Sequence, residues 1–141
     1  MTELHKEVIE YYTKESKKIA SENAYSKHIL MCIDYVYDNI YSGVSVQDAA
    51  AALGLTPQYL SKLFKQEVGI KLSDFIMNKR ITAAENMLRY SEYSPLDIGN
   101  YLCFSSHSHF ISCFKKKTGL TPRKYREYYF RINWGNDKDK G

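Results

Sequence analysis

The sequence predicts an all-α protein, with two helix-turn-helix subdomains joined by a long linker helix and about seven core helices in total. Three observations predict this fold: helix-start signals recur, the alternating pattern of strands is almost absent, and one sequence pattern occurs twice. Residues 60–65, LSKLFK, recur as residues 110–115, FISCFK, and each stretch is followed at the same spacing by a glycine, Gly69 or Gly119. Upstream, residues 50–55 match residues 99–104 at an offset of 49, whereas the first match has an offset of 50. A change of one residue is expected when the turn between two intact helices gains a residue.

Capping residues mark where the helices begin. Ser45 and Ser94 each stand three residues before a carboxylate, which is the spacing of a capping box. Thr56 and Thr121 each precede a proline, which is well suited to the first helical position. These signals predict core helices at about 26–41, 46–53, 57–67, 72–90, 95–102, 107–117 and 122–130. A weaker eighth helix is expected at about 3–20 from its apolar spacing.

These elements predict a domain organisation in five parts. Residues 1–25 form a connecting helix or linker, 26–70 the first helix-turn-helix subdomain, 71–91 the linker helix, 92–131 the second subdomain, and 132–141 a flexible tail.

Composition bounds the class of protein. The 141 residues suffice for one ordinary domain or two very small ones. No long apolar run is present, so we expect no membrane span, and the first residues do not open a secretory signal. Three cysteines without a spaced pair indicate reduced thiols in a cytoplasmic protein.

Positive charge gathers where the repeat lies. Residues 1–54 carry 5 Lys/Arg and 8 Asp/Glu, whereas residues 55–131 carry 13 Lys/Arg and 6 Asp/Glu. The second region therefore suits contact with a polyanion, although a solvated basic face would have the same charge.

A small residue in the first helix of each pair, Ala50 or Gly99, faces the next helix. Such a residue lets the second helix cross closely, as a helix-turn-helix requires. Gly99 is smaller than this crossing needs, and it weakens its helix by roughly 1 kcal/mol relative to alanine.

Three stretches carry a family resemblance. They are residues 50–69 (AAALGLTPQYLSKLFKQEVG), 80–88 (RITAAENML) and 98–126 (IGNYLCFSSHSHFISCFKKKTGLTPRKYR). In this order they resemble the first helix-turn-helix, the linker helix and the second helix-turn-helix of the AraC/XylS family of bacterial transcription regulators. Cys103 stands where the family usually has glycine, and Gly99 where alanine is usual. These departures predict a second helix-turn-helix that is looser than the first and discriminates bases less.

The resemblance implies a regulator, and we expect an activator, that binds double-stranded DNA, recruits RNA polymerase and needs no cofactor. Family members commonly carry a sensing domain before this unit. Residues 1–25 are therefore either the end of a helix from a missing sensor, which we favour, or the start of a short stand-alone regulator. A rival interpretation is a protein-interaction module that dimerises or docks through helix 3–20 and has only non-specific affinity for DNA.

A recognition helix reads bases with the outward residues near its N-terminus. Helical spacing and the resemblance together predict base contacts from Gln58, Tyr59, Ser61 and Lys62 in one helix, and from His107, Ser108, Ile111 and Ser112 in the other. Two alternatives stay open: Lys62 contacts either guanine or a phosphate, and Ile111 contacts either a thymine methyl or the edge of the core.

Phosphate contacts are expected from basic residues and helix N-termini. The predicted residues are Ser45, Lys65, Ser94, Lys115, Lys116, Thr121, Arg123 and Lys124. For Lys117 we favour a solvated position, and Arg126 is expected to pair with an acid at the rim of the core.

The linker helix at 72–90 spans roughly 28 Å at about 1.5 Å per residue. One turn of DNA is about 34 Å, so we expect the recognition helices to address successive major-groove segments with some bending of the DNA.

Other chemistries are not supported. Cys103, His107, His109 and Cys113 straddle a turn and a helix whose period points Cys113 inward and His107 outward, so no metal site is predicted. No phosphate loop or nucleophile–base pair is recognisable, so no catalytic residue is assigned and no enzyme is expected.

Overall fold

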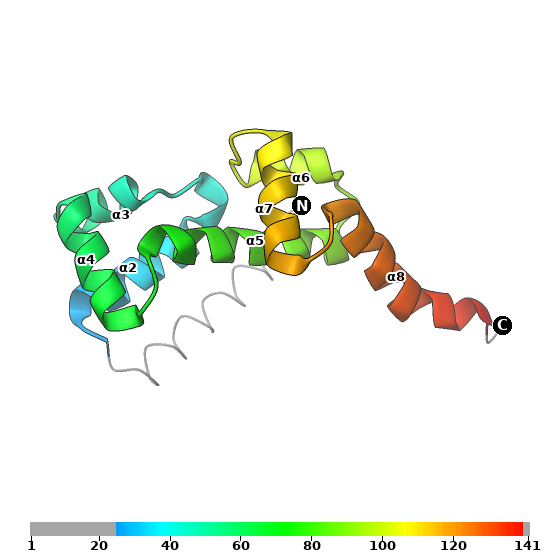
Figure 1. Ribbon diagram of the computed structural model, residues 1–141, viewed down its shortest axis with the longest axis horizontal. Coiled ribbons are helices and arrows are strands. Elements are labelled where there is room, and N and C mark those ends of the chain that lie inside the picture. The colour runs from blue at the N-terminus through cyan, green and yellow to red at the C-terminus, as the bar shows by residue number, and fades with distance from the viewer. Residues whose placement is uncertain (1–24, 140–141) are drawn as a thin grey trace. The chain divides into compact units, whose positions relative to one another are not determined.

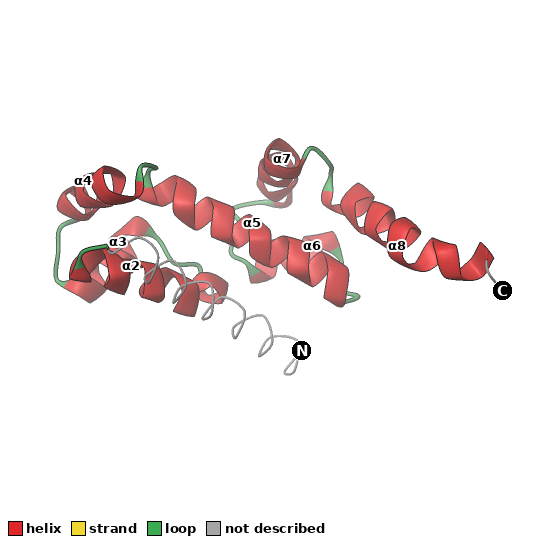
Figure 2. Cartoon of the chain, turned by 90° about the horizontal axis from the view of Figure 1, so that it is seen from below, coloured by secondary structure: helices red, strands yellow, loops and turns green. Residues whose placement is uncertain are grey.

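The computed structural model describes residues 25–139 of the chain. The helix predicted at 3–20, the linker role of residues 1–24 and the last two residues lie outside the described residues. Within the described range every segment is helix or loop, and no strand is present (Figures 1 and 2).

The described elements are seven α-helices and one short 3₁₀ helix. They are α2 (Lys27–Asp38), η1 (Ile40–Ser42), α3 (Val46–Leu53), α4 (Pro57–Val68), α5 (Leu72–Tyr90), α6 (Pro95–Tyr101), α7 (His107–Thr118) and α8 (Pro122–Asp139). The predicted all-helical class is confirmed.

Helix starts agree with the capping signals. At the start of α3, Ser45 Oγ accepts from the Asp48 N–H at 3.1 Å, and an Asp48 carboxylate oxygen accepts from the Ser45 N–H at 3.1 Å. This is the predicted capping box. The hydroxyls of Thr56, Ser94 and Thr121 each accept from the N–H three residues later.

Two predicted helix ends are wrong. The first helix ends at Asp38, because the Asn39 N–H and side chain turn back to carbonyls of the last turn before the chain enters η1. The last helix continues to Asp139, so the flexible tail predicted from residue 132 is helical as far as that residue. No proline interrupts α8 after its first residue, and the helix continues through Gly135.

The chain divides into two compact units between Arg80 and Ile81, so the predicted linker helix is shared between them. In the first unit, Leu60 and Phe64 of α4 are buried, and Phe75 of α5 packs edge-on against the Phe64 ring at 5.1 Å. At the other end of α4, Glu67 accepts hydrogen bonds from the Ser26 N–H and hydroxyl at 2.7 and 2.6 Å. The inner face of α4 is therefore packed in the core, and its last turn is hydrogen-bonded to the start of α2.

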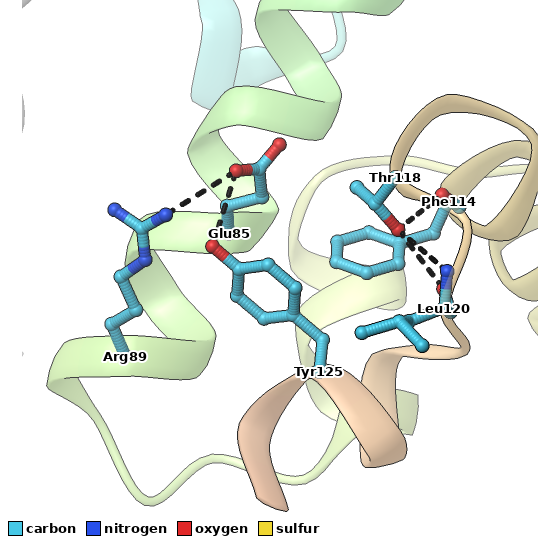
Figure 3. A network of polar contacts seen from close by, with 6 residues as sticks. All are labelled: Glu85, Arg89, Phe114, Thr118, Leu120 and Tyr125. Atoms are coloured by element: carbon cyan, nitrogen blue, oxygen red, sulfur yellow. Dashed lines mark hydrogen bonds and ion pairs between the residues drawn. The ribbon is translucent and has the colours of Figure 1, made fainter. Parts of the chain in front are cut away.

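The second unit is built on a chain of aromatic rings. Phe110 lies 4.8 Å from Phe104 and 5.8 Å from Phe114, and Phe114 lies 5.3 Å from Tyr125 of α8 (ring centroids). The Tyr125 hydroxyl donates to Glu85 of α5 at 3.2 Å, and Glu85 also lies 3.6 Å from Arg89 (Figure 3). Burial and the nearby Glu85 raise the pKa of Tyr125, which keeps its hydroxyl protonated as the donor. These contacts hold α7 and α8 against the second half of α5.

Gly99 is needed for close packing, which corrects the prediction that it makes the second unit looser. A Cβ added at Gly99 would lie 2.9 Å from Phe110 Cδ2 and 3.2 Å from Phe110 Cβ, and both residues are buried. In the first unit the equivalent pair is Ala50 with Leu60, also fully buried. The larger side chain on the recognition helix of the second unit is thus matched by a smaller one on the helix it crosses.

We expect Gly99→Ala to lower the free energy of unfolding by about 1 kcal/mol or more, because overpacking outweighs the gain in helix propensity. The same substitution in a Phe110→Leu background recreates the Ala50–Leu60 pair and should be neutral or stabilising. Urea unfolding of the two single variants and the double variant measures this coupling. An increase in stability for Gly99→Ala alone would contradict the close packing.

Cys103 occupies a left-handed turn. Its φ is 64°, the only positive φ of a non-glycine residue in the described part of the chain, and the equivalent Gly54 has a φ of 71°. The two turns share a hydrogen-bond pattern: the Phe104 N–H donates to Gly99 O at 3.0 Å, and the Leu55 N–H donates to Ala50 O at 2.9 Å. The turn therefore keeps its geometry without glycine, at a cost in backbone strain.

Replacing Cys103 with glycine should raise the free energy of unfolding by about 1 kcal/mol relative to Cys103→Ala, because only glycine adopts this φ without strain. The alanine variant is the matched control, since it removes the thiol and keeps the strain. Equal stabilities of the two variants in chemical denaturation would show that the turn is unstrained.

Candidate nucleic-acid interface

The outer face of α4 carries the residues predicted to read bases in the first unit. Gln58, Tyr59 and Lys62 are exposed and Ser61 is half-buried, while Leu60 and Phe64 face the core. Tyr59 is 52% exposed, so its ring is accessible from solvent. The predicted outward placement of these four residues is thus consistent with the structure.

A basic depression of about 480 Å³ lies beside this face. It is formed by the start of α3, the outer face of α4 and the start of α5, and three lysines line it: Lys62, Lys65 and Lys71. No acidic residue lines it. The clustering of three cations about one hollow favours an anion there.

Sequence reasoning missed Lys71. Its backbone carbonyl accepts the first hydrogen bond of α5, from the Phe75 N–H at 3.0 Å, and it is exposed. The repeat carried the signal, because Lys71 is the counterpart of Thr121, which stands in the same position before α8 and was predicted to contact phosphate.

The outer face of α7 carries the second predicted set. His107, Ser108 and Ser112 are exposed and Ile111 is half-buried, whereas Phe110 and Phe114 are fully buried. His109, on the same helix, is engaged locally, because its Nδ1 lies 3.1 Å from the Ser105 hydroxyl and its ring packs against Phe104.

A second depression, of about 310 Å³, occupies the equivalent place in the second unit. It is formed by the start of α6, the outer face of α7 and the start of α8. Its lining residues are Ser94, Pro95, Leu96, His107, Ile111, Thr121, Pro122 and Arg123. Each unit therefore presents a hollow where two helix N-termini flank the outer face of one helix.

The helix N-termini differ in their electrostatics. Asp48 lies in the first turn of α3 and Asp97 in that of α6, so a carboxylate already occupies the positive end of each of these helices. The first turn of α8 holds no acid and contains Arg123 and Lys124. Among the N-termini predicted at Ser45, Ser94 and Thr121, the last is therefore the most favourable for a phosphate.

The predicted basic phosphate contacts are exposed. Lys65 lies in the last turn of α4, and Lys115 and Lys116 lie in that of α7 together with Lys117. Arg123 lies 3.4 Å from Glu127, but both side chains are largely exposed, and such pairs contribute little. Arg123 is thus free to exchange this partner for a phosphate.

Arg126 has the predicted structural role, and the acid near it is Glu92, but its hydrogen bonds go to the backbone. Its guanidinium donates to three backbone carbonyls, those of Leu88 at 3.0 Å, Ser91 at 3.1 Å and Tyr93 at 2.6 Å. These carbonyls lie in the last turn of α5 and just beyond it, where carbonyl groups have no N–H partner within the helix. Burial lowers the pKa of Arg126, which remains a cation at neutral pH.

The described residues give two further findings. No group of three or more His, Cys, Asp or Glu side chains in residues 25–139 is arranged to hold a metal ion. None of the described helices is long and apolar enough to cross a membrane.

Known proteins with similar sequences identify the family of this chain. Residues 49–128 match a family described as a helix-turn-helix domain. The chain is 32% identical over 67% of its length to the uncharacterized HTH-type transcriptional regulator YtdP of Bacillus subtilis, and 32% identical over 55% of its length to the HTH-type transcriptional activator RhaR of Yersinia pseudotuberculosis. These matches span only 12% and 27% of the two relatives.

Solved structures agree with the sequence relatives. An AraC-type transcriptional regulator from Chromobacterium violaceum superposes with a TM-score of 0.66 at 28% identity, covering 72% of this chain and 91% of that one. The DNA-binding domain of AdpA, solved with a target DNA, shares the fold at 18% identity with a TM-score of 0.71, covering 77% and 97%. The chain belongs to the AraC-type helix-turn-helix family of transcription regulators and carries its DNA-binding domain.

Proposed function

We propose that this protein binds double-stranded DNA sequence-specifically and regulates transcription, with α4 and α7 as two recognition helices in successive major-groove segments. One observation carries the proposal: each unit presents the exposed face of one helix between two helix N-termini, with basic residues alongside. This is the arrangement in which side chains reach base edges while N-termini and cations hold the flanking phosphates.

The wider role follows from the relatives. RhaR is named an activator, which supports activation here and, with it, contact with RNA polymerase. The chain matches only part of each curated relative. The proposal therefore includes a sensing domain that acts together with this DNA-binding domain. A role on DNA places the protein in the bacterial cytoplasm and requires no catalytic group.

Fluorescence anisotropy with random 25-base-pair duplexes tests DNA binding directly. We expect affinity to fall steeply between low and high salt, because phosphate neutralisation releases counterions. Affinity that is weak and insensitive to salt would contradict the proposal and favour a protein-interaction role.

Lys62→Ala should relax specificity at one base position and lower affinity for the preferred site by about 1–3 kcal/mol, because a base contact is lost. Lys71→Ala is the matched control, since Lys71 lines the same depression from the start of α5 and should weaken all sequences alike. Binding to a panel of single-base variants measures both effects. A uniform loss for Lys62→Ala would assign Lys62 to phosphate.

Lys115→Ala and Arg123→Ala should each weaken binding to every sequence and reduce the slope of log affinity against log salt by about one. Lys117→Ala controls for charge, because Lys117 is also exposed in the last turn of α7 and is expected to stay solvated. If Lys117→Ala changes the slope as much as Lys115→Ala, the assigned phosphate contacts are wrong.

A further inference from the structure

The two depressions occupy equivalent places and differ in a few of their lining residues. Lys62, Lys65 and Lys71 line the one in the first unit, together with the apolar Val46 and Leu72. In the second, Pro95 and Pro122 stand in the places of Val46 and Leu72, Leu96 and Ile111 add two further apolar side chains, and Arg123 is the one lysine or arginine in the lining. The second hollow therefore has fewer cations and two apolar side chains that the first hollow lacks.

The apolar lining is not demanded by the fold. Ile111 is the counterpart of Ser61, and both residues are half-buried, so the first unit forms the same helix pair with a polar residue at this position. Leu96 has 49% of its surface exposed although it lies in the first turn of α6, where a polar residue would satisfy the helix equally well. Both side chains thus form an apolar surface that the core does not use.

The surroundings of this apolar surface indicate its partner. Arg123 lines the depression, Lys115 and Lys116 are exposed on the same helix as Ile111, and the acid-free N-terminus of α8 forms one wall. A positive rim favours a polyanion, and DNA is the polyanion that the DNA-binding domains of this family bind. In the major groove the apolar group that a base presents is the 5-methyl of thymine.

We propose that the depression formed by Leu96, Ile111, Pro95 and Pro122 receives thymine methyl groups, so that the second unit reads thymine by apolar contact. The inference rests on the proposed DNA-binding function and specifies what its second half recognises. The first unit has Gln47 and Ser61 in the places of Leu96 and Ile111, and it reads its segment by hydrogen bonds.

Uracil substitution tests this proposal without altering base pairing. A preferred duplex is first selected from the random pool, and each thymine is then replaced singly by uracil, which lacks only the 5-methyl group. We expect at least one thymine in the segment contacted by α7 whose replacement weakens binding about fourfold, the effect of removing one buried methyl from contact. Equivalent replacements in the segment contacted by α4 should change affinity less than twofold.

The Ile111→Ser variant carries the residue that the first unit has at the equivalent position, Ser61. It should bind the thymine duplex and the uracil duplex with equal affinity. Leu96→Ser provides a second variant at an exposed position, should Ile111→Ser unfold, and it should also reduce the discrimination. Full-strength discrimination in a folded variant, or no uracil effect in the unaltered protein, overturns the inference. Selection of duplexes without thymine in that segment overturns it as well. Absence of any DNA binding would instead refute the proposed function.

Discussion

Everything in each unit depends on how closely the first helix of the helix-turn-helix approaches the recognition helix. In the second unit this approach leaves room only for glycine, because a Cβ added at Gly99 would lie 2.9 Å from Phe110, and in the first unit the equivalent residues Ala50 and Leu60 are both fully buried. Once these residues are packed, the inner face of the recognition helix is fixed. Because an α-helix repeats every 3.6 residues, the direction of its outer face is fixed as well. The face proposed to contact DNA is thus oriented by core packing.

The same frame carries two different surfaces. The repeat conserves what packing requires, namely the buried residues Phe64 and Phe114 and the helix starts on either side. The outer positions differ between the two copies: Lys62 and Ser61 in the first unit correspond to Ser112 and Ile111 in the second. One repeated scaffold therefore presents two different outer faces.

The sequence predicted the features that depend on local chemistry. Capping at Ser45, Thr56, Ser94 and Thr121 identified helix starts because each cap is made by residues within three positions. The outward faces of α4 and α7 followed from helical periodicity. Helix ends were harder to predict: at Asn39 the chain turns through hydrogen bonds that composition does not reveal.

Features that join distant residues could not be predicted from single positions. Gly99 seemed merely destabilising because its meaning depends on Phe110. For Arg126 the sequence predicts an acid, and Glu92 acts on its charge, but the sequence does not show that the carbonyls of Leu88, Ser91 and Tyr93 accept its hydrogen bonds. Lys71 lies next to Lys62 and Lys65 only in the folded protein, where parts of α3, α4 and α5 surround the first depression. Comparing the two copies of the repeat would have found Lys71, since Thr121 was recognised in the equivalent place.

The central claim is that both exposed helix faces read base sequence. Sequencing the duplexes that the protein enriches from a random pool, at a salt concentration that suppresses non-specific binding, tests this claim most directly. The account predicts two enriched blocks about one helical turn of DNA apart. A single enriched block would show that one of the two units only anchors to the backbone, and it would contradict the claim.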